Sequence, residues 1–92
     1  MSANWQERRL EPRRRASGPV RLNVGDALQP RAVAGRLLDV SAHGFRAAHD
    51  FAGLAAGEEI GFEHTGRRGR ARVAWTRVAG GQVESGFFVV AG

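Results

Sequence analysis

The sequence predicts an all-β domain, a barrel or a sandwich, and of the two we expect a six-stranded antiparallel barrel. Short segments that alternate apolar and polar residues recur roughly every ten residues, and glycine-rich turns separate them. The stretch from Phe51 to Gly57 is too short and too broken by glycine for a helix. A chain of 92 residues can build only one modest core, and closing its sheet into a barrel removes the exposed strand edges.

Alternation identifies the strands in order, beginning with Val20, Leu22 and Val24 directly after Gly18-Pro19. The polar turn Ser41–Gly44 ends the second strand, and a brief third strand follows it. The predicted strands span residues 20–24, 31–40, 45–48, 59–64, 70–77 and 82–90.

Two hairpins are predicted in the second half of the chain. Thr65–Gly69 forms the loop of the first, and Gly80-Gly81 forms the turn of the second. Ala71, Val73 and Trp75 are expected to share one face of their strand, which favours a core position for Trp75.

All 14 basic residues are arginine, and the net charge is +5. A guanidinium can hold a phosphate or a guanine edge through two parallel hydrogen bonds, so an anionic partner is expected. A GC-rich genome, which favours arginine codons, explains the same composition. Two groups of arginines stand out, namely Arg8, Arg9, Arg13, Arg14 and Arg15, and Arg67, Arg68, Arg70 and Arg72.

Residues 1–18 are predicted to form an extended, mobile, arginine-rich arm, and residues 19–92 the barrel. The arm has no sustained apolar periodicity, and Pro12 removes a backbone donor. The chain has no cysteine, no apolar run of about 20 residues and no apolar signal sequence. We therefore expect a cytoplasmic protein that does not enter the membrane.

Composition also favours a non-enzyme without a catalytic residue, metal or cofactor. Cysteine and tyrosine are absent, and His43, His49 and His64 lie apart without the spacing of a metal site. Each histidine is expected at a loop or strand end, in contact with water.

Two short motifs suggest a binding site. Arg9 and Arg13 form an RxxxR motif on the arm, and Asp39–Gly44 forms a DxSxxG motif at the end of the second strand. Each alone has an ordinary explanation, because basic arms are common and Asp, Ser and Gly are frequent turn residues.

Taken together and in this order, the two motifs resemble those of the PilZ family. Pro19-Val20-Arg21-Leu22 and Ala71–Trp75 are similar to other strands of that family, and Ser85–Phe88 to its closing G-x-x-F strand. Almost the whole chain is covered, but it stops at Gly92 without the C-terminal helix of many members.

The resemblance implies a receptor for cyclic di-GMP. Arginines of the arm would clamp the ligand through guanine or phosphate, while the carboxylate and hydroxyl of the second motif would form the floor of the site. The implied ligand-binding residues are Arg8, Arg9, Arg13, Asp39, Ser41, Gly44 and Trp75.

Binding would order the arm and signal to an unidentified effector protein, with the receptor a monomer or weak dimer. One alternative is a ligand-independent PilZ-like adaptor for other proteins. Another is a nucleic-acid-binding barrel that uses the hairpin around Gly66–Arg70, which is disfavoured because no run of aromatic residues accompanies it.

Overall fold

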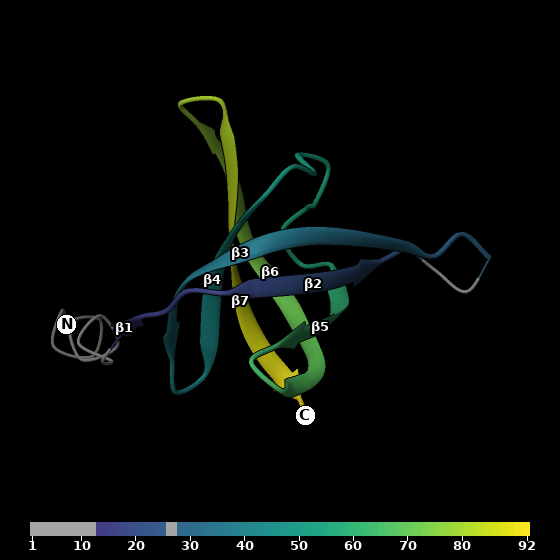
Figure 1. Ribbon diagram of the computed structural model, residues 1–92. Coiled ribbons are helices and arrows are strands. Elements are labelled where there is room, and N and C mark those ends of the chain that lie inside the picture. Colours follow the sequence, from purple (N-terminus) through teal and green to yellow (C-terminus); the bar gives the residue numbers. More distant parts are fainter. Residues whose placement is uncertain (1–12, 26–27) are drawn as a thin grey trace, which may run out of the picture.

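The computed structural model describes residues 13–25 and 28–92, and this part of the chain is all-β, without a helix. Six strands form a closed antiparallel barrel, as predicted, and one further strand lies outside the ring (Figure 1). The strands are β1 (Arg13–Arg15), β2 (Pro19–Val24), β3 (Arg31–Ser41), β4 (Gly44–His49), β5 (Glu59–His64), β6 (Arg67–Ala79) and β7 (Gln82–Ala91).

The ring runs β3-β2-β5-β6-β7-β4, and pairing between β3 and β4 closes it. Every pairing in the sheet is antiparallel. Strand β3 is long enough to pair with β2 along its first half and with the extra strand β1 at its end. The centres of β2/β5 and β4/β7 therefore lie on opposite sides of the ring.

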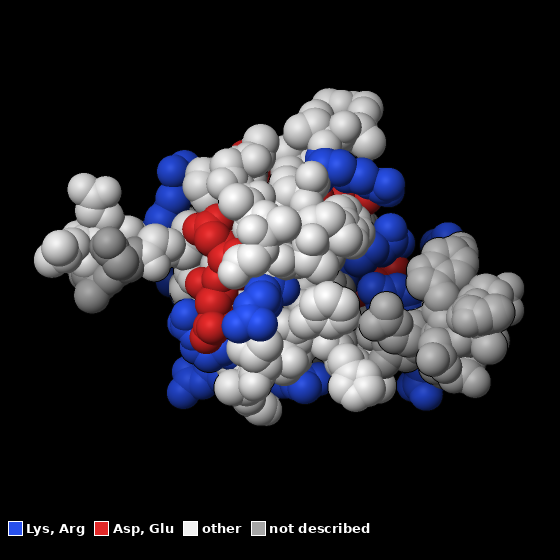
Figure 2. Space-filling model, turned by 180° about the vertical axis from the view of Figure 1, so that it is seen from behind, with Lys and Arg blue, Asp and Glu red and all other residues white. Residues whose placement is uncertain are grey.

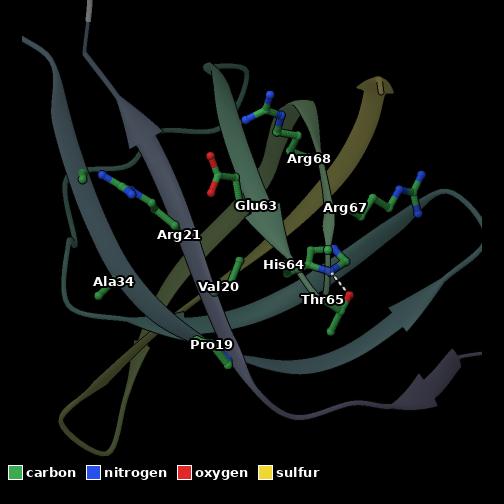
Figure 3. Close-up of a pocket in the computed structure, with 11 residues that line it drawn as sticks. Pro19, Val20, Arg21, Ala34, Glu63, His64, Thr65, Arg67 and Arg68 are labelled. Carbon is green, nitrogen blue, oxygen red and sulfur yellow. Dashed lines mark hydrogen bonds between the residues drawn. The ribbon is translucent and has the colours of Figure 1, made fainter.

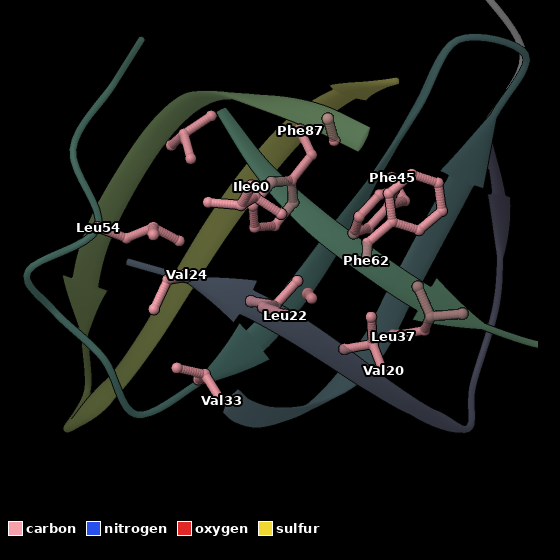
Figure 4. Close-up of a cluster of buried hydrophobic side chains, with 13 residues drawn as sticks. Val20, Leu22, Val24, Val33, Leu37, Phe45, Leu54, Ile60, Phe62 and Phe87 are labelled. Carbon is pink, nitrogen blue, oxygen red and sulfur yellow. The ribbon is translucent and has the colours of Figure 1, made fainter. Parts of the chain in front are cut away.

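The core fills the barrel because alternate residues of each strand point inward. Phe45 is completely buried and stacks on Phe87, with ring centroids 4.7 Å apart, and tilts against Phe62 at 5.1 Å. Figure 4 shows this cluster with the aliphatic side chains of the neighbouring strands. The remaining labelled members are Val20, Leu22, Val24, Val33, Leu37, Leu54 and Ile60.

The first predicted hairpin loop is shorter than expected. Thr65 and Gly66 have φ angles of +44° and +75°, the two positive values of a tight two-residue turn. Strand β6 consequently begins at Arg67, so Arg67 and Arg68 are strand residues and the prediction of a loop over residues 65–69 was wrong. The second predicted turn, Gly80-Gly81, is confirmed by φ angles of +60° and +78°.

Two of the three register irregularities change which side chains of β3 and β6 face outward at the motifs. In the β3–β4 pairing Leu37 lies opposite Ala47 but Asp39 lies opposite Arg46. Similarly, Val73 lies opposite Phe87 but Trp75 lies opposite Gly86. Each shift inserts one extra residue in the longer strand and reverses the alternation beyond it.

The shift in β6 corrects the prediction for Trp75. Val73 points into the core, but the bulge turns Trp75 to the outside of the barrel, where it is half-buried. The expected common face of Ala71, Val73 and Trp75 therefore ends at Val73.

The described end of the arginine arm, Arg13–Arg15, is extended as predicted and forms strand β1 on the edge of β3. The arm prediction for residues 1–12 lies outside the described residues. Within the described part of the chain, no helix has the length and apolar character needed to cross a membrane.

Candidate ligand site

The described residues of the two motifs meet on the outer face of the barrel, in two neighbouring rows across the strands. Because paired residues point to the same face, the register defines each row. The first, here called the Asp39 row, runs Arg15, Asp39, Arg46, Gly86, Trp75. The second, the Ser41 row, runs Arg13, Ser41, Gly44, Phe88, Arg72.

Asp39 is the centre of charge in this site. Although it lies on the outer face, it is only 6% exposed. Arg46 contacts its Oδ2 through both Nε and Nη2, each at 2.7 Å, and Arg13 Nε lies 3.7 Å from Oδ1. Oδ1 is buried and accepts no hydrogen bond within the described part of the chain. A buried carboxylate oxygen without a donor is costly, so this atom is suited to accept from a bound molecule.

Trp75 ends the Asp39 row as an aromatic surface on the outside of the barrel. Its indole covers Gly86, where a β-carbon would lie 2.6 Å from both Cε2 and Nε1 of the ring. Arg77 lies over the same ring, with its guanidinium carbon 5.3 Å from the centroid, and pairs with Glu84 at 3.2 Å. A planar group that reaches this end of the row meets both an aromatic ring and a guanidinium.

Ser41 and Gly44 belong to the turn between β3 and β4, where the Ser41 hydroxyl lies 3.5 Å from the Gly44 carbonyl oxygen. Gly44 is required by the sheet itself, because a β-carbon there would lie 2.1 Å from the Phe87 carbonyl oxygen. The structure thus gives Gly44 a role in strand packing.

The positive charges of the site come from several strands. Arg13 and Arg15 lie on β1, Arg46 on β4 and Arg72 on β6. On the face of the barrel seen in Figure 2, acidic side chains lie beside arginines, so the two signs are interspersed there. Asp39 is surrounded in the same way, with arginines on both neighbouring strands.

Sequence reasoning missed several members of the two rows, namely Arg15, Arg46, Gly86, Phe88 and Arg72. Arg46 follows the DxSxxG motif by two residues. A prediction that the next strand pairs antiparallel with β3 would have placed Arg46 beside Asp39. Phe88 is 58% exposed, and its place depends on the register of β7, which the alternation pattern does not reveal. Arg8 and Arg9, also predicted for the site, lie outside the described residues.

The prediction that all three histidines contact water was wrong for His49 and His64, which are 8% and 7% exposed. Both continue the inward alternation of their strands, a signal present in the sequence. His49 Nδ1 accepts a hydrogen bond from the Phe51 amide at 3.0 Å, and its Nε2 lies 2.8 Å from the Ser85 hydroxyl. His43, in contrast, is exposed in the turn before β4.

Burial lowers the pKa of both His49 and His64 below the usual value of 6.5, because water no longer stabilises the imidazolium. The positive charge of Arg67 lowers the pKa of His64 further, whereas Asp50 partly offsets the effect at His49. Neither side chain belongs to the two rows, so both histidines serve the interior of the barrel.

No group of three His, Asp or Glu side chains within residues 13–25 and 28–92 has the arrangement of a metal site. The two rows offer different chemistry, namely a carboxylate oxygen that accepts no hydrogen bond from a described residue, several guanidinium donors and an aromatic surface. Two interstrand steps of about 4.8 Å separate Asp39 from Gly86, and the Trp75 indole lies over Gly86, so the carboxylate and the indole are roughly 10 Å apart along the row.

Comparison with known proteins adds no relative. No protein-family model matches the chain, and no curated protein is significantly similar to it.

Proposed function

We propose that the two rows form a binding site for an anionic purine nucleotide. Nucleotides combine negative phosphates with flat bases whose edges carry hydrogen-bond donors and acceptors. The rows combine arginines for the phosphates, an aromatic surface for a base and a carboxylate oxygen that lacks a donor.

Within this class, the ligand we propose is cyclic di-GMP, and the protein is its receptor rather than an enzyme. The observation that carries the proposal is the buried Oδ1 of Asp39, which accepts no hydrogen bond from a described residue. A guanine presents adjacent N–H donors on its Watson–Crick edge, and a carboxylate can accept from both. Adenine offers only one amino group on that edge, so Asp39 favours guanine.

The arginines account for the rest of the ligand. Arg13 and Arg46 lie on either side of Asp39 and can reach phosphate oxygens or the O6 and N7 atoms of a guanine. Arg9 of the RxxxR motif and Arg8, the residue before it, would close over the ligand from the arm. Ordering the arm would change the shape and charge of this face, which an effector protein could recognise.

Titration calorimetry with cyclic di-GMP tests the proposal, with GMP and a short oligonucleotide as controls. We expect saturable binding of cyclic di-GMP that is tighter than binding of GMP and survives at about 0.15 M salt. Affinity that instead rises with oligonucleotide length would identify a nucleic-acid-binding barrel. The absence of binding to any nucleotide would leave the ligand-independent adaptor as the better description.

A further inference from the structure

A second surface lies on the opposite side of the barrel from the Asp39 and Ser41 rows. It is an open groove of about 730 Å³ over β2, β5 and the adjoining halves of β3 and β6. Its apolar part consists of Pro19, Val20, Ala32 and Ala34. The two alanines are exposed and short, so they leave room on the outer face for a bound chain.

The polar part of the groove is a row of residues in register across four strands. Ala34 lies opposite Arg21, Arg21 opposite Glu63, and Glu63 opposite Arg68. Figure 3 shows Glu63 between Arg21 and Arg68, with Arg67 on the far side of the tight turn. Three guanidinium groups therefore border a groove with one carboxylate near its middle.

Although Glu63 lies opposite Arg21 and Arg68 in the register, these arginines form no ion pair in the described part of the chain. Among the described residues, Arg21, Arg67 and Arg68 form no ion pair or side-chain hydrogen bond. Arg70 and Arg72, a few residues along β6, both contact Glu59, at 3.1 Å and 3.8 Å. The groove thus carries three arginines that have no ion pair among the described residues.

The chemistry of the groove selects among anionic partners. Single-stranded nucleic acid binds through aromatic rings that stack on bases, but among the described residues the groove is lined by no Phe, Tyr or Trp, and the His64 ring in its lining is buried. Glu63 would also repel a phosphate placed at the centre. A peptide suits the same surface, because its acidic side chains can pair with the arginines while its amides donate to Glu63.

We propose that this groove binds a short, extended, acidic segment of a partner protein. Carboxylates of the segment pair with Arg21, Arg67 and Arg68, and small apolar side chains between them contact Ala32 and Ala34. The row crosses three interstrand spacings, roughly 14 Å, so about four to six extended residues fill it. The proposal does not depend on the ligand of the opposite face.

The first test uses a fluorescently labelled peptide of about six residues in which glutamate and valine alternate. Its binding is measured by fluorescence anisotropy at about 0.15 M salt. We expect saturable binding to the intact chain and none by the analogue with lysine in place of glutamate. Absence of saturable binding by the acidic peptide overturns the proposal. Tighter binding of a thymidine oligonucleotide of equal charge also overturns it, in favour of a nucleic-acid surface.

Paired variants separate the groove from general positive charge. Replacing both groove arginines, Arg67→Ala with Arg68→Ala, should weaken peptide binding by at least about tenfold, the scale of lost charge-assisted hydrogen bonds. The matched control compares the single variants Arg68→Ala and Arg70→Ala, because Arg70→Ala removes the same charge from an arginine already paired with Glu59 and should change binding by about threefold or less. Equal losses in the two variants would overturn the proposal.

A further variant tests shape without changing charge. Ala34→Trp fills the apolar part of the groove from an exposed position, so the barrel should fold while peptide binding falls by about tenfold. Amide chemical shifts locate the peptide directly. Changes at Ala34, Glu63 and Thr65 are expected, whereas changes confined to Arg46 and Trp75 would place the peptide on the opposite face and overturn the proposal.

Discussion

Arg46 bonds a single oxygen of Asp39 through two of its nitrogen atoms and leaves the other oxygen, Oδ1, without a hydrogen bond from a described residue. The pair thus holds the carboxylate in one orientation while keeping one acceptor free. An ion pair that served stability alone would satisfy both oxygens, for instance through a bidentate guanidinium. The arrangement gives the clearest test of the proposed nucleotide site.

Asp39→Asn should weaken cyclic di-GMP binding by about 1–3 kcal/mol, because an amide cannot accept from two guanine donors as a carboxylate does. The matched control is Glu63→Gln, which makes the same change of charge on the opposite face and should leave the affinity nearly unchanged. Calorimetry at about 0.15 M salt measures both, and a thermal melt checks folding. If binding were only a general attraction between a basic protein and an anion, both variants would bind cyclic di-GMP more tightly. Tighter binding by Asp39→Asn would therefore exclude the proposed site.

Arginines of the RxxxR motif should matter more than arginines elsewhere. Arg9→Ala and Arg13→Ala should each reduce cyclic di-GMP affinity by about 1–3 kcal/mol through loss of a charge-assisted or bidentate contact. The variant with both Arg67→Ala and Arg68→Ala loses more charge but should bind nearly as well as the parent chain, apart from a smaller dependence on salt. A larger loss of affinity in the Arg67→Ala, Arg68→Ala variant than in Arg9→Ala or Arg13→Ala would contradict direct contact between the arm and the ligand.

Gly86 should support ligand binding through the ring that covers it. Gly86→Ala places a methyl group 2.6 Å from the present Trp75 ring atoms, so the indole must move. If a base stacks on that indole, both Gly86→Ala and Trp75→Ala should cost about 1–3 kcal/mol of binding free energy. Combining them provides the control, because Gly86→Ala should add little once the ring is absent. A full additional loss in the double variant would show that Gly86 acts in another way.

The buried histidines predict how stability depends on pH. The folded state lowers the pKa of His49 and His64 below 6.5, so the unfolded chain binds protons more readily. The free energy of unfolding should therefore be constant above the unfolded value and decrease as the pH falls below 6.5 toward the lowered folded values. Urea denaturation between pH about 7.5 and 5.5, where carboxylates stay ionised, measures the slope.

Two substitutions assign that slope to particular residues. His49→Gln should make the stability less dependent on pH, because it removes one of the two buried imidazoles. Adding His64→Gln should flatten the dependence further, because it removes the second buried imidazole. An unchanged slope in the His49 variant would show that this imidazole does not control stability in the acidic range.

The strands could be predicted closely because each follows the alternation that a barrel imposes on half-buried residues. Strand β5 has the predicted bounds, Glu59–His64, and Val20, Leu22 and Val24 are buried as their spacing indicates. The same rule applied to His49 and His64 would have placed both inside. Their polarity argued for water, but hydrogen bonds to Ser85 and Thr65 satisfy it within the fold.

The site was harder to predict because it depends on register between strands far apart in sequence. Asp39 could be identified from its motif, but its partner Arg46 requires the β3–β4 pairing, and Trp75 faces the site only because of the bulge in β6. A single inserted residue reverses every later side chain, and no simple pattern of apolar residues marks where it occurs.

Strand β1 gives the barrel an open edge built from Arg13, Arg14 and Arg15. A second copy adding its own β1 there would bring like charges face to face at the interstrand distance of about 4.8 Å, at a cost that rises as salt is removed. The edge should therefore resist growth into fibrils, because like charges keep crowded chains apart at the strand that, among the described residues, lies outside the closed ring.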